Sequence, residues 1–219
     1  MRGLGGGAED PKGGKAFASQ MSLSPDRRFA IERVNIVTSE ETGEVTDDSP
    51  FLRVIERKTR RVVARIPKEG QAPFPLEAKF LWAPDSKRFA WNCRAGGRDE
   101  RTALFQYDDG KFVELKDAAE EIGRDVVGAE HERQFKALNL PADTYRREIW
   151  DSWQATRWKD NATLELTVTS LRTVADPTTN EAKSLEARFR LTLKFDQQGR
   201  WRLIKTVKVL EPPIDRENR

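Results

Sequence analysis

The phrase Leu23-Ser24-Pro25-Asp26-Arg27-Arg28-Phe29-Ala30 occurs again, one residue longer, as Trp82-Ala83-Pro84-Asp85-Ser86-Lys87-Arg88-Phe89-Ala90. In each copy a proline, which fixes φ, precedes an aspartate, whose carboxylate can accept hydrogen bonds from the backbone N–H groups that follow. Each phrase therefore predicts a tight turn that leads into a strand. Because a repeated phrase indicates a repeated structural unit, we expect residues 21–116 to be built twice from one plan.

Strand patterns surround both turns, so each unit is predicted to be a blade of about four antiparallel strands. The expected strands of the first unit are 29–37, 52–57 and 61–66, and those of the second are 79–82, 88–93, 102–107 and 111–115. The last two are joined by Asp109-Gly110, a pair typical of a hairpin turn. Two such blades cannot close a ring, because propellers of this kind have four to eight blades.

The second half of the chain changes character. Apolar residues at helical spacing predict a helical segment within 117–147, as one helix or two, since Gly123 and Gly128 weaken it. Strict alternation around Leu164, Leu166 and Val168 then predicts an antiparallel sheet over 148–211, packed with the helical segment. Residues 1–20 are expected to be a flexible leader and 212–219 a tail. The predicted fold class is mainly β, with a helical insert and a C-terminal β-meander.

The Pro-Asp phrase resembles the repeat of TolB-like β-propellers, which reads roughly Ser-Pro-Asp-Gly-Lys-x-hydrophobic-Ala-hydrophobic. The residues that match in the first copy are Ser24, Pro25, Asp26, Phe29 and Ala30. Those that match in the second are Pro84, Asp85, Phe89, Ala90 and Trp91, with Trp82 where an aromatic residue is common before the turn. Neither copy has the glycine, and Arg27 and Ser86 stand near its place. The resemblance covers at most residues 21–116, and it implies a blade architecture in a bacterial protein of the cell envelope, with no activity attached. The Gly199-Arg200-Trp201 stretch also loosely resembles the last hairpin of cystatin-like domains.

Composition indicates a surface-rich protein with a balanced charge. Apolar residues make up 37% and charged residues 34% of the 219 residues, and the net charge is +3. We therefore expect no nucleic-acid partner. An acidic stretch at 39–50 and a basic one at 53–68 are interpreted as neighbours that partly neutralise each other; a cation-binding loop and a polyanion-binding ribbon are the alternatives.

The sequence contains no apolar run long enough to cross a bilayer. The sequence does not decide the cellular compartment of the protein. The periplasm or the exterior is favoured if a signal peptide has been removed, and the cytoplasm otherwise.

The sequence offers few catalytic residue types. His131 is the single histidine and Cys93 the single cysteine, so we expect no zinc site and no other cofactor. His131 is predicted to be solvated on a helix face, and Cys93 to be a buried, inert thiol. Ala95-Gly96-Gly97-Arg98 is interpreted as a loop, since it lacks the lysine of a phosphate-binding loop. A pair of carboxylates in a hydrolase remains possible, although no spacing singles one out.

Three tryptophans, Trp150, Trp153 and Trp158, are the candidate ligand-binding residues. If 149–158 is a strand, simple alternation places Trp150 and Trp158 on one face and Trp153 on the other. The rings could pack in the core, stack on a sugar, or contact a partner protein. Farther along, Trp201, Leu203, Val207 and Val209 are expected to share one face of a strand, with Lys205 interrupting it.

The function that fits these features is a non-catalytic binding or scaffolding protein, because repeats are present without a catalytic set of residues. Its expected partner is another protein, reached through sheet edges or loops. The alternatives are a carbohydrate-binding module that uses the tryptophans, and a hydrolase with a carboxylate site. Exposed rings on one flat surface would favour the first alternative, and a raised carboxyl pKa in a pocket would favour the second.

Overall fold

The computed structural model describes residues 15–37, 51–66, 74–94, 100–115, 118–141, 144–175 and 181–209. The acidic stretch 39–50, the 95–98 loop, most of the leader and the C-terminal tail lie outside these residues. The chain divides into two compact units. Unit 1 comprises residues 1–94 and 103–115, and unit 2 comprises residues 95–102 and 116–219.

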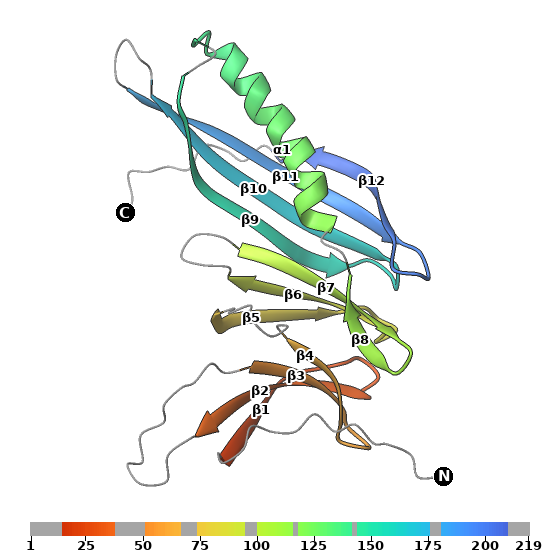
Figure 1. Cartoon of the computed structure of the whole chain (residues 1–219). Coiled ribbons are helices and arrows are strands. Elements are labelled where there is room, and N and C mark those ends of the chain that lie inside the picture. The colour runs from red at the N-terminus through yellow and green to blue at the C-terminus, as the bar shows by residue number, and fades with distance from the viewer. Residues whose placement is uncertain are drawn as a thin grey trace. The chain divides into compact units, whose positions relative to one another are not determined.

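Unit 1 is built from antiparallel strands in two sheets (Figure 1). The first sheet has the order β1-β2-β3-β4, with β1 at Lys15–Leu23, β2 at Phe29–Val37, β3 at Phe51–Glu56 and β4 at Arg61–Ile66. The second contains β5 (Phe74–Trp82), β6 (Arg88–Arg94), β7 (Glu100–Asp108), whose first residues belong to unit 2, and β8 (Lys111–Glu114), which pairs with β7. The expected mainly β, blade-like class is confirmed, and the described strands close neither a barrel nor a propeller.

The two Pro-Asp turns have the same hydrogen bonds, and these define which residues are equivalent. Ser24 N–H donates to Phe29 O at 3.0 Å, and Ala83 N–H donates to Arg88 O at 2.8 Å. Asp26 Oδ1 accepts from Arg28 N–H, as Asp85 Oδ1 does from Lys87 N–H. Arg27 and Ser86 both have positive φ, 59° and 61°. The position that the TolB-like pattern gives to glycine is thus the position that needs a left-handed backbone.

The alignment of Phe29 with Phe89 in the repeat pattern is wrong by one residue. Equivalent residues are 59 positions apart through the turns, so Phe29 corresponds to Arg88, and Phe89 corresponds to Ala30. Phe29 and Phe89 therefore project from opposite faces of equivalent strands. Both nevertheless enter one core, where each ring packs against Trp82 and Phe112. The face of one sheet thus packs against the opposite face of the other, which is how successive blades of a repeat pack.

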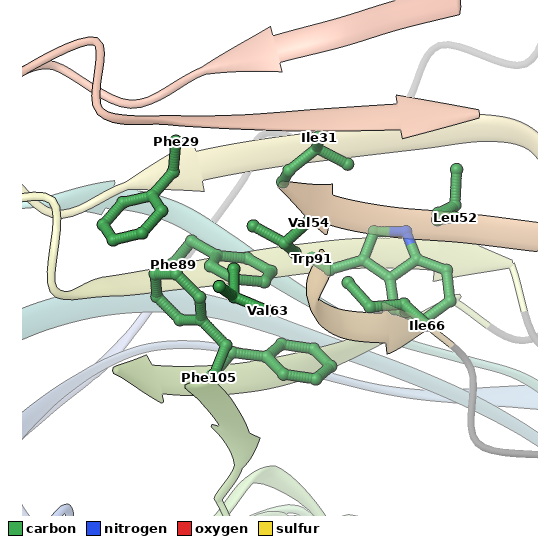
Figure 2. Packing of buried hydrophobic residues seen from close by; sticks show 10 residues of the cluster. Phe29, Ile31, Leu52, Val54, Val63, Ile66, Phe89, Trp91 and Phe105 are labelled. Carbon is green, nitrogen blue, oxygen red and sulfur yellow. The ribbon is translucent and has the colours of Figure 1, made fainter. Parts of the chain in front are cut away.

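The core of unit 1 lies between its two sheets. Phe29 and Ile31 from β2, Leu52 and Val54 from β3, and Phe89 and Trp91 from β6 belong to one buried cluster, which Figure 2 shows from close by. Phe89 also stacks on Phe105 of β7 at 4.7 Å between ring centroids. Aromatic pairs of this kind add roughly 0.5–1.5 kcal/mol each to the burial of their surface. The repeat therefore stabilises unit 1 through one aromatic core.

Unit 2 is a helix packed on an antiparallel meander. The helix α1 (Ala118–Ala137) is single, so Gly123 and Gly128 do not divide it. The strands β9 (Arg146–Trp158), β10 (Thr163–Ala175), β11 (Ala182–Phe195) and β12 (Trp201–Lys208) pair in that order, and α1 packs on β10 and β11 (Figure 1). Within the described part of the chain, no helix combines the length and apolarity needed to span a membrane.

Candidate binding surface on the C-terminal sheet

The sheet of unit 2 has one apolar face and one polar face. The apolar face carries Leu164, Leu166 and Val168 of β10 and Leu191 and Leu193 of β11, all fully buried. The helix covers this face, because Phe135 of α1 packs against Val174 and Leu185. The polar face carries the alternate residues. They are Trp150, Ser152, Gln154 and Arg157 of β9, Thr163, Glu165, Thr167, Thr169 and Leu171 of β10, Arg188, Arg190, Thr192 and Lys194 of β11, and Arg202, Lys205 and Val207 of β12.

A bulge in β9 rearranges the three candidate tryptophans. Glu165 pairs with Arg157 while the next residue, Leu166, pairs with Ala155, so Thr156 is an extra residue and the alternation reverses there. Trp153 and Trp158 therefore share the apolar face, where Trp158 packs on Phe195 at 5.7 Å, and Trp150 lies alone on the polar face. The face assignment made from simple alternation is wrong. All three rings are half-buried, and a ligand for them stays a prediction.

A second bulge, at Ile204, shapes β12. Thr192 pairs with Lys205 and Leu193 with Leu203, so Ile204 has no partner across the ladder. Trp201 and Leu203 consequently point to the apolar face, whereas Lys205 and Val207 share the polar face. The expectation of one continuous apolar face over this strand is wrong. The adjacent apolar pair Leu203-Ile204, which breaks the period-two pattern, is the sequence signal that could have located the bulge.

β12 is the last strand in the sheet order, and its outer edge has no partner strand among the described residues. Val209 N–H donates to Arg188 O, so Val209 and Arg188 form a hydrogen-bonded pair, as do Val207 and Arg190 two residues on. The intervening residues, Thr206 and Lys208, direct their backbone N–H and C=O groups away from β11. The sequence pattern predicts the strand but does not show which of its edges is free.

Apolar side chains accompany the unpaired backbone groups. Ile204 is 47% exposed and Val207 is 40% exposed. Few other large apolar side chains among the described residues are exposed to this extent. Lys205 and Lys208 lie beside them and are also exposed. The edge of β12 therefore combines free hydrogen-bonding groups, apolar contact area and positive charge.

Charge on the polar face is only partly balanced. Glu165 pairs with Arg157 and with Lys159, and these contacts lower the pKa of the Glu165 carboxyl. Glu186 pairs with Arg188 at 3.2 Å. By contrast, Arg190, Arg202 and Lys205 are exposed, and no carboxylate of the described residues pairs with them. A positive surplus therefore remains beside β12.

His131 does not lie where its charged neighbours in the sequence suggested. It is only 7% exposed, on the side of α1 that faces the sheet, and its Nε2 lies 3.4 Å from Ser170 O. Burial lowers the His131 pKa, and the charge of Arg172 lowers it further. The prediction of a solvated histidine is wrong, because this side of α1 packs against the sheet. The charged neighbours in the sequence are each paired with a cation, Glu130 with Lys208 and Glu132 with Arg146.

The described residues do not favour the hydrolase alternative. All their carboxyl groups whose pKa departs from the ordinary value have a lowered pKa, as with Glu130, which accepts hydrogen bonds from Arg133 and Lys208. A general acid needs the opposite shift. No three His, Cys, Asp or Glu side chains in the described ranges gather as a metal site requires. Cys93 is half-buried and packs against the core of unit 1.

Comparisons with known proteins do not establish a family. No family model matches the sequence, and no curated protein matches it. One solved structure, from a study of two prolyl endopeptidases, is similar over 86% of this chain and 28% of the peptidase chain, with 11% identity and a TM-score of 0.34. A TM-score this low does not establish a shared fold.

Proposed function

We propose that this protein is a non-catalytic binding protein that accepts an extended segment of a partner protein at the free edge of β12. An extended segment that pairs with an exposed sheet edge gains main-chain hydrogen bonds, while its alternate side chains contact the two faces of the sheet. The observation that carries the proposal is the outward direction of the Thr206 and Lys208 backbone groups.

The side chains around this edge support the same proposal. Ile204 and Val207 supply exposed apolar area, which a partner strand would cover. The neighbouring strand β11 is held in place by the helix, since Phe189, Leu191 and Leu193 of β11 are buried on the face that α1 covers. An incoming segment would therefore extend a pre-formed sheet, and the protein would lose little conformational freedom on binding.

A proline substitution tests the main-chain part of the proposal. Thr206→Pro removes an N–H that points away from β11, so the β11–β12 ladder stays intact, whereas Thr206→Ala keeps that N–H. Peptides selected on the full chain from an unbiased display library should bind the native protein and Thr206→Ala equally. They should bind Thr206→Pro at least about tenfold more weakly, as expected for a lost main-chain hydrogen bond.

Hydrogen exchange supplies the structural readout. The amides of Thr206 and Lys208 should become protected when a selected peptide binds, and the chemical denaturation midpoint of Thr206→Pro should match that of the native protein. The proposal fails if no peptide is enriched over an unrelated protein, or if the selected peptides bind Thr206→Pro as tightly as the native chain.

A further inference from the structure

We infer that the segment accepted by β12 is acidic, with carboxylates at alternate positions; this inference rests on the proposed function and names the chemistry of its partner. Three cations lie on the edge strand β12 or on its neighbour β11. Across the ladder Arg190 lies opposite Val207, and Arg202 lies opposite Lys194, while Lys205 is on β12 itself. All three point to the polar face and are exposed.

These cations are not neutralised from within the described part of the chain. The nearby carboxylates are already engaged, Glu165 by Arg157 and Lys159, and Glu186 by Arg188. On the other face, Glu130 accepts hydrogen bonds from Arg133 and Lys208. The nearby carboxylates are thus paired with other cations. An incoming carboxylate would therefore not have to displace a native carboxylate from Arg190, Arg202 or Lys205.

The same charges argue against a second copy of this strand as the occupant. Antiparallel pairing of β12 with itself would place Arg202, Lys205 and Lys208 close to the corresponding cations of the other copy, and like charges facing one another across a ladder are destabilising. Lysine on an edge strand is a common means of preventing such self-pairing. An acidic segment reverses the sign of this interaction, so charge complementarity selects a foreign strand.

Strand geometry sets the spacing that the partner needs. Adjacent strands lie about 4.8 Å apart, and every second side chain points to the same face. Carboxylates at positions i, i+2 and i+4 of the incoming segment would therefore all lie on the polar face, next to Arg202 and Lys205 of β12 and on the same face as Arg190, one strand farther in. The residues between them would lie on the helix-bearing face beside Thr206 and Lys208.

Labelled peptides provide the test on the full chain. A ten-residue peptide that alternates Glu with Thr should bind at least about tenfold more tightly than its Gln-for-Glu counterpart at low salt, and this advantage should shrink as ionic strength rises. Substituting proline at alternate positions of the acidic peptide should abolish binding, because the charges remain and the main-chain donors are lost.

Charge-matched variants locate the contact. Arg202→Gln with Lys205→Gln should weaken the acidic peptide about tenfold. Lys87→Gln with Lys111→Gln removes two exposed lysines of unit 1 and should leave the affinity unchanged. Equal binding of the acidic and neutral peptides, with both lost in Thr206→Pro, would overturn the acidic preference and leave the proposed function standing. If the acidic peptide does not bind at all, the inference is overturned. The proposed function is tested separately, by the display selection.

A polyanion competitor separates a strand site from a general anion surface. If single-stranded DNA displaces the acidic peptide and its own binding is unaffected by Thr206→Pro, the surface recognises negative charge alone, and the inference is overturned. If the DNA does not compete at moderate salt, the backbone edge and the cations act together, as inferred.

Discussion

The backbone N–H of Asp26 donates a hydrogen bond to Ser86 Oγ, at 3.1 Å, and this bond joins the two Pro-Asp turns directly. Ser86 is 1% exposed and occupies the left-handed position that the repeat pattern assigns to glycine. Glycine has no side-chain acceptor and could not receive this bond. The departure from the pattern therefore has a structural reason at Ser86, where the bond offsets part of the backbone strain of a non-glycine residue at φ 61°.

Substitutions at Ser86 should separate the hydrogen bond from the strain. Ser86→Ala loses the acceptor and keeps the strain, and we expect a loss of about 1–2 kcal/mol in the free energy of unfolding. Ser86→Gly also loses the acceptor but relieves the strain, so it should be about 1 kcal/mol more stable than Ser86→Ala. Chemical denaturation measures both, with hydrogen exchange of 88–93 as the signal specific to unit 1. Arg27→Gly, at an exposed equivalent position, should be neutral or stabilising; a destabilised Arg27→Gly would contradict this account.

Truncation at Phe89 should be among the most damaging changes in unit 1. The ring is fully buried and packs on Trp82, Phe105 and Phe112, so Phe89→Ala leaves a cavity and should cost about 3–5 kcal/mol. Tyr145→Ala, at a residue that is 76% exposed, is the control and should change the free energy of unfolding by less than about 0.5 kcal/mol. A cost for Phe89→Ala similar to that of the control would mean that the two sheets do not share this core.

His131 should make the stability of unit 2 depend on pH below neutrality. Its folded pKa lies below the ordinary 6.5, so the unfolded chain binds the proton more readily. The stabilising contribution is complete above pH 6.5 and is lost as the pH falls toward the folded pKa. His131→Gln should flatten this slope between pH 7.5 and pH 5 in chemical denaturation. The charged groups that face His131 are Arg172, Asp151 and Glu130, and none of them is changed in this variant, so an unchanged slope would exclude the histidine as the cause.

Glu130 should act in a lower pH range. Hydrogen bonds from Arg133 and Lys208, together with one from Gln134, hold its pKa well below the ordinary 4.5. Its contribution is therefore complete above pH 4.5 and is lost as the pH falls toward the folded pKa. Glu130→Gln should cost about 1–2 kcal/mol at pH 7, since both cations are partly exposed, and should lose less stability than the native protein on acidification. Arg200→Gln, which breaks a pair with an exposed partner, should have a smaller effect at pH 7.

The turns and strands of this protein can be predicted from residues that are close together in the chain. Proline and aspartate define the two turns through neighbouring backbone groups. The strands at 29–37 and 61–66 and the alternation around Leu166 depend on residues close in the chain. The helical spacing of apolar residues likewise predicts a helical segment, but it does not distinguish one helix from two; the structure has one. These features could be predicted because each depends on interactions within a few residues.

Which side chains share a face of a sheet depends on how the strands pair. The bulges at Thr156 and Ile204 exist because of how β9 and β12 pair with their neighbours, and each reverses the alternation from that point on. Strand pairing also places Trp150 and Trp158 on different faces, and it brings Phe29 and Phe89 into one core from opposite faces of equivalent strands. It leaves the outer edge of β12 without a partner strand among the described residues. A strand's partner and register depend on residues far away in the chain, so a local pattern fixes the strand but not the neighbours of its side chains.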